Sequence, residues 1–106
     1  MTPTRIAMPD EIRAGQPFEV KTLITHPMET GRRPDPLGNP IPQNLITRFT
    51  CRLDGILAFE AALDTGVAAN PYIAFLVSAE RSGTLEFEWH GQHGFNVRET
   101  RAIRVV

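Results

Sequence analysis

The chain has 106 residues, of which 42% are hydrophobic and 22% charged, and its formal net charge is -1. This length predicts a single domain over residues 1–106, and the composition is ordinary for a globular protein. A net charge so close to zero gives no electrostatic basis for binding nucleic acid or an anionic membrane. No stretch reaches the roughly 18 apolar residues of a membrane span. We therefore expect neither a nucleic-acid partner nor a membrane partner.

Apolar and polar residues alternate with period two in the first half of the chain, which is typical of half-buried strands. A short piece near Ile6 to Met8 predicts an edge strand. The first clear strand places Phe18, Val20, Thr22 and Ile24 on one face. The next places one set of residues on its inner face and an opposite set outside: Leu45, Thr47, Phe49, Cys51 and Leu53 inside, and Arg48, Arg52 and Asp54 outside.

The second half of the chain continues this pattern. Asp54-Gly55 predicts a tight hairpin turn into a strand with Leu57, Phe59, Ala61 and Leu63 on one face. The two strands that follow carry Ile73, Phe75, Val77 and Ala79 after Asn70-Pro71, and then Leu85, Phe87 and Trp89 alternating with Glu86, Glu88 and His90. In the last segment, residues 95–106, the pattern breaks at Val97, Glu99 and Arg101, so we expect a bulge or a change of strand partner there.

Six or seven short alternating strands, separated by Gly, Pro, Asn and Asp, predict an all-β fold. One apolar face per strand is what two sheets around a shared core require. The predicted architecture is an immunoglobulin-like antiparallel sandwich of about seven strands.

The connection after the first clear strand is too long for a hairpin turn. It begins with Thr25 to Gly31 and continues from Arg32 to Gln43, with prolines at positions 34, 36, 40 and 42. Loops of this length in compact domains are usually functional or mobile. Proline lowers the conformational entropy lost on binding, and Met28 offers a flexible apolar contact. The alternative is a rigid crossover between sheets with Met28 packed beneath it.

Few residues are candidates for catalysis. Cys51 is the single cysteine, which excludes an internal disulfide, and its strand phase directs it into the core, where a thiol is unreactive. His26, His90 and His93 match no closed zinc site, even with Cys51 or Glu29 added. We expect no metal and no cofactor. A thiol- or metal-dependent redox protein using Cys51 and His26 stays open as an alternative.

One run of the long loop is distinctive: Ile24-Thr25-His26-Pro27-Met28-Glu29-Thr30-Gly31, followed by Asp35, Gly38, Ile41-Pro42 and Ile46. Asn70-Pro71 before a strand with Phe75, Trp89 on the penultimate strand, and a terminal Ile103-Val105 strand accompany it. With these residues the chain resembles, over nearly its whole length, SoxZ, the small subunit of the SoxYZ carrier of bacterial sulfur oxidation.

The resemblance implies an immunoglobulin-like subunit without catalytic activity that pairs with SoxY during thiosulfate oxidation. SoxY carries sulfur intermediates on a cysteine near its Gly-rich C-terminal arm, and other Sox enzymes visit that cysteine transiently. This chain ends in Arg101-Ala102-Ile103-Arg104-Val105-Val106, without the carrier motif, so Cys51 is not expected to carry sulfur.

The resemblance also sets expectations for the partner site and the compartment. The expected partner-binding residues are His26, Pro27, Met28, Glu29, Thr30, Gly31 and Asp35. The N-terminus does not show the pattern of a signal peptide. The resemblance implies export to the periplasm bound to SoxY. An isolated subunit with an uncovered apolar interface is expected to form a homodimer. A free-standing sandwich that binds an unrelated protein is the remaining alternative.

Overall fold

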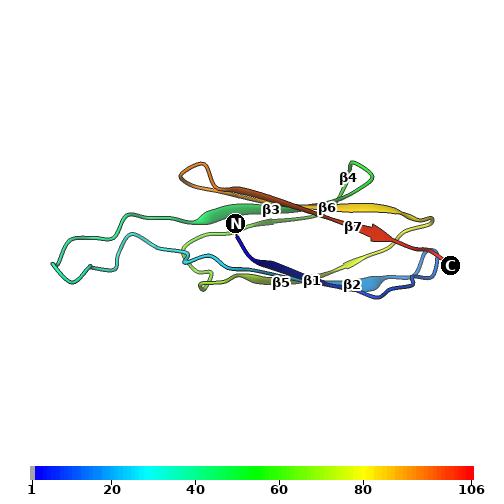
Figure 1. Ribbon diagram of the computed structural model, residues 1–106, viewed down its shortest axis with the longest axis horizontal. Helices are drawn as coiled ribbons and strands as arrows, with labels where there is room; N and C mark the ends of the chain where they lie inside the picture. The colour runs from blue at the N-terminus through cyan, green and yellow to red at the C-terminus, as the bar shows by residue number, and fades with distance from the viewer. Residues whose placement is uncertain (1) are drawn as a thin grey trace.

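A computed structural model describes residues 2–106, which form two facing antiparallel sheets (Figure 1). The strands are β1 (Thr4–Ala7), β2 (Phe18–Ile24), β3 (Ile46–Leu53), β4 (Ile56–Ala62), β5 (Tyr72–Val77), β6 (Gly83–Gly91) and β7 (Asn96–Ile103). One sheet has the order β1-β2-β5 and the other the order β4-β3-β6-β7. The predicted all-β sandwich is confirmed. Within residues 2–106 there is no helix long and apolar enough to cross a bilayer.

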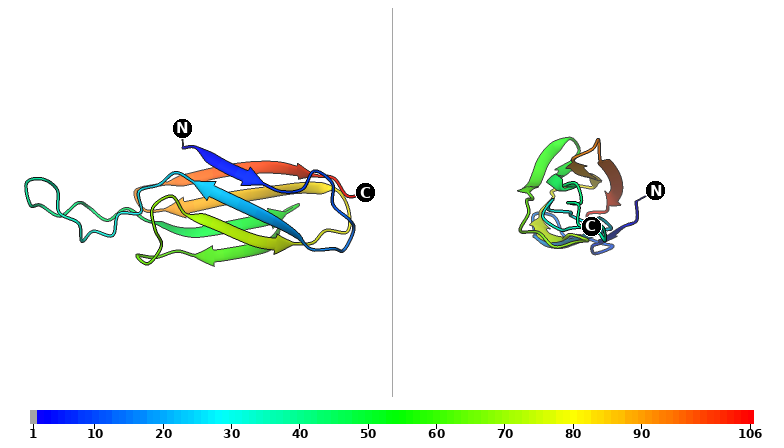
Figure 2. Two further views of the ribbon diagram at one scale, coloured as in Figure 1. Left: turned by 90° about the horizontal axis from the view of Figure 1, so that it is seen from below. Right: turned by 90° about the vertical axis from the view of Figure 1, so that its left-hand side faces the viewer.

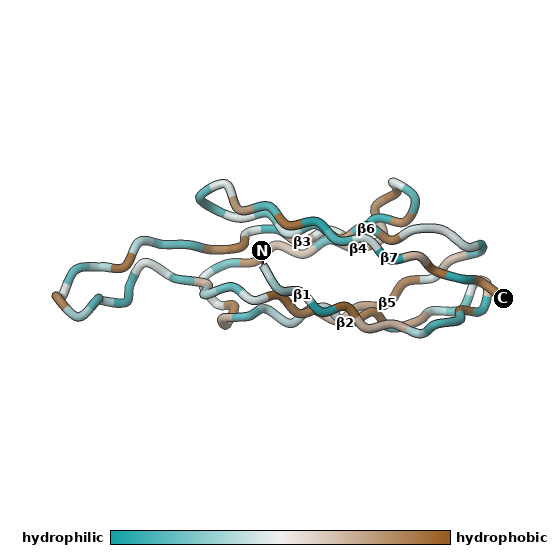
Figure 3. Tube along the Cα trace, in the orientation of Figure 1, coloured by the Kyte–Doolittle hydropathy of each residue, from teal (hydrophilic) through white to brown (hydrophobic). Residues whose placement is uncertain are grey.

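The core lies between the two sheets, and within the described residues the predicted inner faces of β2, β5 and β6 supply eight of its seventeen buried hydrophobic residues. Alternate residues of β2 are buried from Phe18 to Ile24. Phe49 of β3 lies 5.1 Å from Trp89 of β6 and 5.7 Å from Phe75 of β5, measured between ring centroids. This aromatic cluster therefore joins one sheet to the other. Figure 3 shows hydrophobic residues recurring along the strands of both layers.

The strand β3 departs from the predicted alternation. Its pairing register shifts between Ile46 and Arg48 on the β6 side and between Cys51 and Arg52 on the β4 side. The first shift leaves Thr47, which was predicted to lie inside, exposed, while Phe49 and Cys51 keep their predicted inward positions. Thr50 is also buried, although it lies opposite the outward residues Glu60 and Glu88. A bulge inserts a residue into one strand and changes which residues face the core. The predicted tight turn at Asp54-Gly55 is confirmed, since both residues have positive φ.

The bulge predicted for the last segment is wrong. β7 pairs with β6 in an unbroken register from Asn96 to Ile103. The polar residues that interrupt the alternation lie at the edge of the sandwich. There the hydroxyl of Thr4 donates to Glu99 (3.0 Å), and Arg101 pairs with Glu99 (3.4 Å). A small polar cluster, rather than an irregular backbone, accounts for the interrupted pattern.

The connection between β2 and β3 projects away from the sandwich along its long axis, as Figures 1 and 2 show. It gives the molecule its longest dimension, 58 Å against 22 and 19 Å. We call residues 29–44 the arm, and residues 25–28 together with Leu45 its root.

Candidate functional site

The root of the arm is fixed through the backbone of His26. Its N–H donates to the side-chain oxygen of Asn70 (2.9 Å), and its carbonyl accepts from the N–H of Asn70 (2.7 Å). Asn70 adopts a positive φ of 55°, which asparagine tolerates better than most residues. The turn before β5 therefore locks the point at which the arm leaves β2.

The imidazole of His26 is buried, and it holds the next turn of the root. Its Nδ1 accepts from the N–H of Met28 (3.0 Å), so the proton of the neutral ring lies on Nε2. That Nε2 and the Oδ1 of Asn44 are both buried without a hydrogen-bond partner. Burial lowers the pKa of His26, and the Asn44 side chain acts in the opposite direction. His26 is therefore held neutral, because protonation of Nδ1 would remove the acceptor for Met28.

Met28 fastens the root to the second sheet. Its backbone has a positive φ of 50°, unusual for a residue with a long side chain, and its side chain is 4% exposed. The thioether sulfur accepts from the N–H of Ile46 at 3.3 Å. Met28 thus packs beneath the arm, as the rigid-crossover alternative described, and offers no surface for direct contact with a partner.

The turn between β6 and β7 clamps the returning limb of the arm. Leu45 donates to the side chain of Gln92 and accepts from its backbone N–H, both at 2.9 Å. The Gln92 amide also donates to Gln43 (2.7 Å), and the ring of His93 bonds to the Gln43 carbonyl (2.7 Å). Gly91 permits this approach, because a Cβ there would lie 2.6 Å from the carbonyl oxygen of Leu45.

The arm is a structured hairpin with an apolar tip. Glu29 and Asn44 exchange two backbone hydrogen bonds of 2.8 Å, and Ile41 donates to Arg33 (2.8 Å) farther out. At the tip, the carboxylate of Asp35 accepts from the N–H groups of Leu37 and Asn39, both at 2.9 Å. The side chain of Leu37 is 87% exposed. The arm therefore holds its shape by its own contacts and presents a leucine at its end.

A charge pair lies on the arm close to its base. Arg33 contacts Glu29 with both its Nε and its terminal nitrogen, and this guanidinium lowers the pKa of Glu29. Gly31 lies between them with a φ of 85°, and a Cβ there would approach the Cβ of Gln43 to 3.1 Å. The close packing of the two limbs thus explains the glycine.

The structure separates the predicted partner-binding residues into three groups. His26 and Met28 are buried and position the root, while Pro27, Glu29, Thr30 and Gly31 lie around it at or near the surface. Asp35 lies at the tip of the arm, where its carboxylate accepts from Leu37 and Asn39. Sequence reasoning missed the clamp, which consists of Gln43, Asn70, Gln92 and His93.

The candidate residues for thiol or metal chemistry do not form a site. Cys51 is fully buried, and burial raises the pKa of its thiol to about 12. His90 pairs with Glu88 (2.9 Å), while His93 contacts the arm. Within residues 2–106, no three side chains of His, Cys, Asp or Glu come together as a group that would hold a metal ion.

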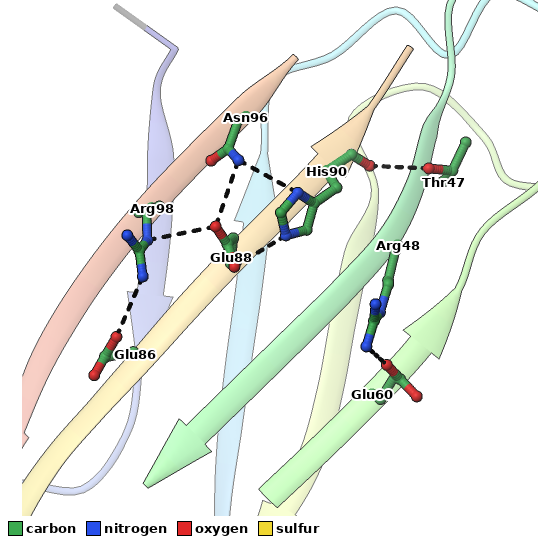
Figure 4. A network of polar contacts seen from close by, with 8 residues as sticks. All are labelled: Thr47, Arg48, Glu60, Glu86, Glu88, His90, Asn96 and Arg98. Carbon is green, nitrogen blue, oxygen red and sulfur yellow. Dashed lines mark hydrogen bonds and ion pairs between the residues drawn. The ribbon is translucent and has the colours of Figure 1, made fainter. Parts of the chain in front are cut away.

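The outer face of the four-stranded sheet is polar, and most of its charges pair with one another (Figure 4); within the described residues Arg52 is the exception. Arg98 lies 3.6 Å from Glu86 and 3.4 Å from Glu88, and Arg48 pairs with Glu60. Asn96 contacts both Glu88 and His90. This face therefore has little unsatisfied charge to offer a partner.

The model of the family "Sulphur oxidation protein SoxZ" matches residues 6–102, nearly the whole chain. The chain belongs to the SoxZ family. No curated protein sequence gives a match. The sequence resemblance drawn from the His26–Gly31 loop is thereby confirmed, and in this chain the loop builds the arm with its clamped root.

Solved structures similar to this SoxZ-family chain share its fold. A superoxide reductase (neelaredoxin) from Ignicoccus hospitalis superposes with a TM-score of 0.74 at 20% identity, covering 97% of this chain and 80% of that one. The sulfur carrier protein SoxY from Chlorobium limicola f thiosulfatophilum gives a TM-score of 0.65 at 11% identity, covering 97% and 78%. A putative superoxide reductase from Thermotoga maritima gives 0.73 at 14% identity, covering 97% and 85%. At these identities the similarity concerns the fold alone.

Proposed function

We propose that this chain is the non-catalytic scaffold subunit of a sulfur-oxidation carrier, and that it pairs with a SoxY-like subunit bearing the sulfur-carrying cysteine. Membership of the SoxZ family carries this proposal. The burial and high pKa of Cys51 support it, because a carrier or nucleophilic thiol has to be accessible and readily deprotonated. The sulfur chemistry of thiosulfate oxidation then takes place on the partner.

The arm has a guiding role in this proposal. The surfaces that meet the partner or a visiting Sox enzyme are Pro27 of the root, the adjoining arm residues Glu29, Thr30 and Gly31, and the tip, which Asp35 shapes. His26 and Met28 act through position, since they hold the root in one conformation. A preorganised arm loses little conformational entropy on binding, which favours repeated, reversible contact.

The same proposal places the protein in the periplasm, exported together with its partner. It also implies that the isolated subunit forms a homodimer through the surface that SoxY normally covers. Light scattering over a range of protein concentrations tests this point. A monodisperse monomer at high concentration would contradict it.

Co-purification with the SoxY of the same organism is the decisive experiment. We expect a stable one-to-one complex when the two subunits are co-expressed and the mixture is sized by light scattering. Absence of a complex would contradict the proposal and favour the alternative of a free-standing domain that binds an unrelated protein. A fast-reacting native thiol would instead favour the thiol-dependent alternative.

Substitutions at two neighbouring charged residues distinguish two possible roles of the arm. Glu29→Ala leaves Arg33 without its partner, whereas Arg32→Ala removes an exposed charge for which the structure of residues 2–106 shows no ion pair. If the arm assembles the carrier, Glu29→Ala weakens SoxY binding and Arg32→Ala does not. If the arm meets visiting enzymes, Glu29→Ala leaves the complex intact and lowers the turnover of carrier-bound sulfur.

A further inference from the structure

The two long sides of the sandwich, where the edges of the sheets meet, differ in chemistry. The β1/β7 side is bridged by the Thr4–Glu99 hydrogen bond and the Glu99–Arg101 pair. On the opposite side lie β4, which pairs only with β3, and β5, which pairs only with β2. These two strands approach each other without joining, and a groove runs between them. The β4/β5 side therefore presents two free strand edges beside a groove.

Large apolar side chains concentrate on this open side. The groove is lined in part by Ile56, Leu57 and Leu76, which are 75%, 44% and 65% exposed. Leu76 also faces outward from the three-stranded sheet, on the same side of β5 as Tyr72. Tyr72 is 60% exposed and pairs across the strands with Leu23. Of the seven large hydrophobic residues that are exposed within residues 2–106, five thus form one band from the three-stranded face around β5 into the groove.

Charged residues lie beside the band on the three-stranded face, where Glu19 is the cross-strand neighbour of Leu76 and Lys21 that of Ala74. Arg5 and Lys21 flank a shallow hollow that is otherwise lined by apolar groups, including Leu23 and Tyr72. Within the described residues Arg5 forms no ion pair, and Lys21 pairs with Glu19 across exposed surface at 3.5 Å. A complementary partner has an apolar centre with carboxylates placed opposite Arg5 and Lys21.

The area of the three-stranded face decides whether a partner also has to contact the groove. Three strands about 4.8 Å apart, each about six residues long at ~3.3 Å per residue, give a face of only about 300 Å². A stable interface buries about 800 Å² on each partner. The face alone is therefore too small. The adjoining groove can enlarge it, because it adds the exposed Ile56 and Leu57 to the apolar surface, with Asp54, Glu80 and Arg81 also in its lining.

We propose that the SoxY-like subunit of the proposed function, on which this inference rests, covers the three-stranded face and lays an extended apolar segment into the β4/β5 groove. The segment pairs its backbone with the free edge of β5, as an added strand does in peptide recognition by sheet edges. β5 receives the strand because its exposed side chains continue the band, whereas the outward Glu60 of β4 is already paired with Arg48.

Binding measurements on the intact complex test this proposal. Ile56→Arg places a charge in the groove alone, and Leu76→Arg places one where groove and face meet. Thr100→Arg adds the same charge to an exposed position of β7 on the other sheet and serves as the matched control. All three side chains are exposed, and thermal unfolding verifies that each variant is folded.

We expect Ile56→Arg and Leu76→Arg to weaken SoxY binding at least about 30-fold, as central interface residues do, and Thr100→Arg to leave it unchanged. Wild-type affinity of Ile56→Arg in a complex that otherwise forms would overturn the groove while the scaffold function stands. A wild-type chain that forms no complex would remove the scaffold function and this inference together. If Ile56→Arg and Leu76→Arg abolished a homodimer of this chain but left its SoxY affinity unchanged, the groove would belong to a second copy and the proposal would be overturned.

Hydrogen exchange distinguishes strand addition from side-chain contact. The β5 amides that β2 leaves free are expected to gain protection when SoxY binds, while the exchange of the outer β7 amides does not change. Unaltered exchange along β5 in a formed complex would contradict the added strand.

Discussion

The outer faces of the two sheets of this SoxZ-family protein differ in the kind of side chain that they expose. The four-stranded sheet pairs its outward charges among themselves and buries Phe87 and Trp89 completely on its inner face. The three-stranded sheet leaves Leu23, Tyr72 and Leu76 facing outward. Both inner faces supply the core, whereas the proposed recognition surface lies on the outer face of the three-stranded sheet and in the groove that β5 shares with Ile56 and Leu57 of β4. The predictions below test that division, beginning with the largest expected effect.

Truncation of a large aromatic residue is expected to have opposite consequences in the two sheets. Trp89→Ala removes a fully buried ring and should lower the free energy of unfolding by about 3–5 kcal/mol. Tyr72→Ala truncates an exposed ring and should change it by no more than about 0.5 kcal/mol while weakening partner binding. Urea unfolding and SoxY titration measure the two effects.

Trp89→Phe provides the control for the first of these variants. It keeps an aromatic ring in the core and removes the indole N–H, which is buried without a hydrogen-bond partner. We expect a clearly smaller loss than for Trp89→Ala. A Tyr72→Ala variant as unstable as Trp89→Ala would contradict the different roles assigned to these two residues.

Met28 connects the two sheets, so its truncation should cost less than that of Trp89 but more than a surface change. Met28→Ala creates a cavity beneath the arm and removes the sulfur that accepts from Ile46, and about 2–3 kcal/mol of stability should be lost. Met28→Leu conserves the volume without the sulfur and should lose less than about 1.5 kcal/mol. Equal losses in the two variants would assign the effect to the hydrogen bond rather than to packing.

The imidazole of His26 predicts a dependence of stability on pH. Because burial lowers its pKa in the folded state, the unfolded chain binds more protons, and stability is fully present above about pH 6.5. Stability should then decrease as the pH falls toward the folded pKa, up to about the 1 kcal/mol of a hydrogen bond.

His26→Asn is the matched variant for this pH dependence. Its side-chain oxygen can replace Nδ1 as the acceptor for the N–H of Met28, but it does not titrate. The unfolding midpoint of this variant should change less between pH 7 and pH 5.5 than that of the wild type. An identical pH profile in the two proteins would show that His26 does not govern stability in this range.

Much of the fold was readable from the sequence, because period-two alternation directly reports which face of a strand is buried. This holds for β2 and β6, where every second residue lies in the core. It failed in β3, because the two register shifts depend on partner strands that the local sequence does not reveal. It also failed at Glu99 and Arg101, since a polar pair that seals a sheet edge looks like a broken strand.

The position of the candidate site could be predicted from the sequence, but the contacts that hold it in place could not. The His26–Gly31 run and the prolines identified the arm, because a long patterned loop is unusual in a small domain. The burial of Met28 depends on a left-handed backbone, and the clamp depends on Gln92 and Asn70, each more than 40 residues away from the root residue it bonds. Such contacts arise only when the sheets assemble, and sequence spacing carries no signal for them.

The smallest expected effect tests the polar face directly. Arg98 bridges Glu86 and Glu88 across the four-stranded sheet, but its side chain is 66% exposed. Exposed ion pairs are weak because water and salt screen them, so Arg98→Ala should lower stability by less than about 0.5 kcal/mol. The difference should shrink further in 1 M salt, and SoxY affinity should stay at the wild-type value. A variant that kept its stability but lost the SoxY complex would place the interface on the polar sheet and reverse the roles assigned to the two faces.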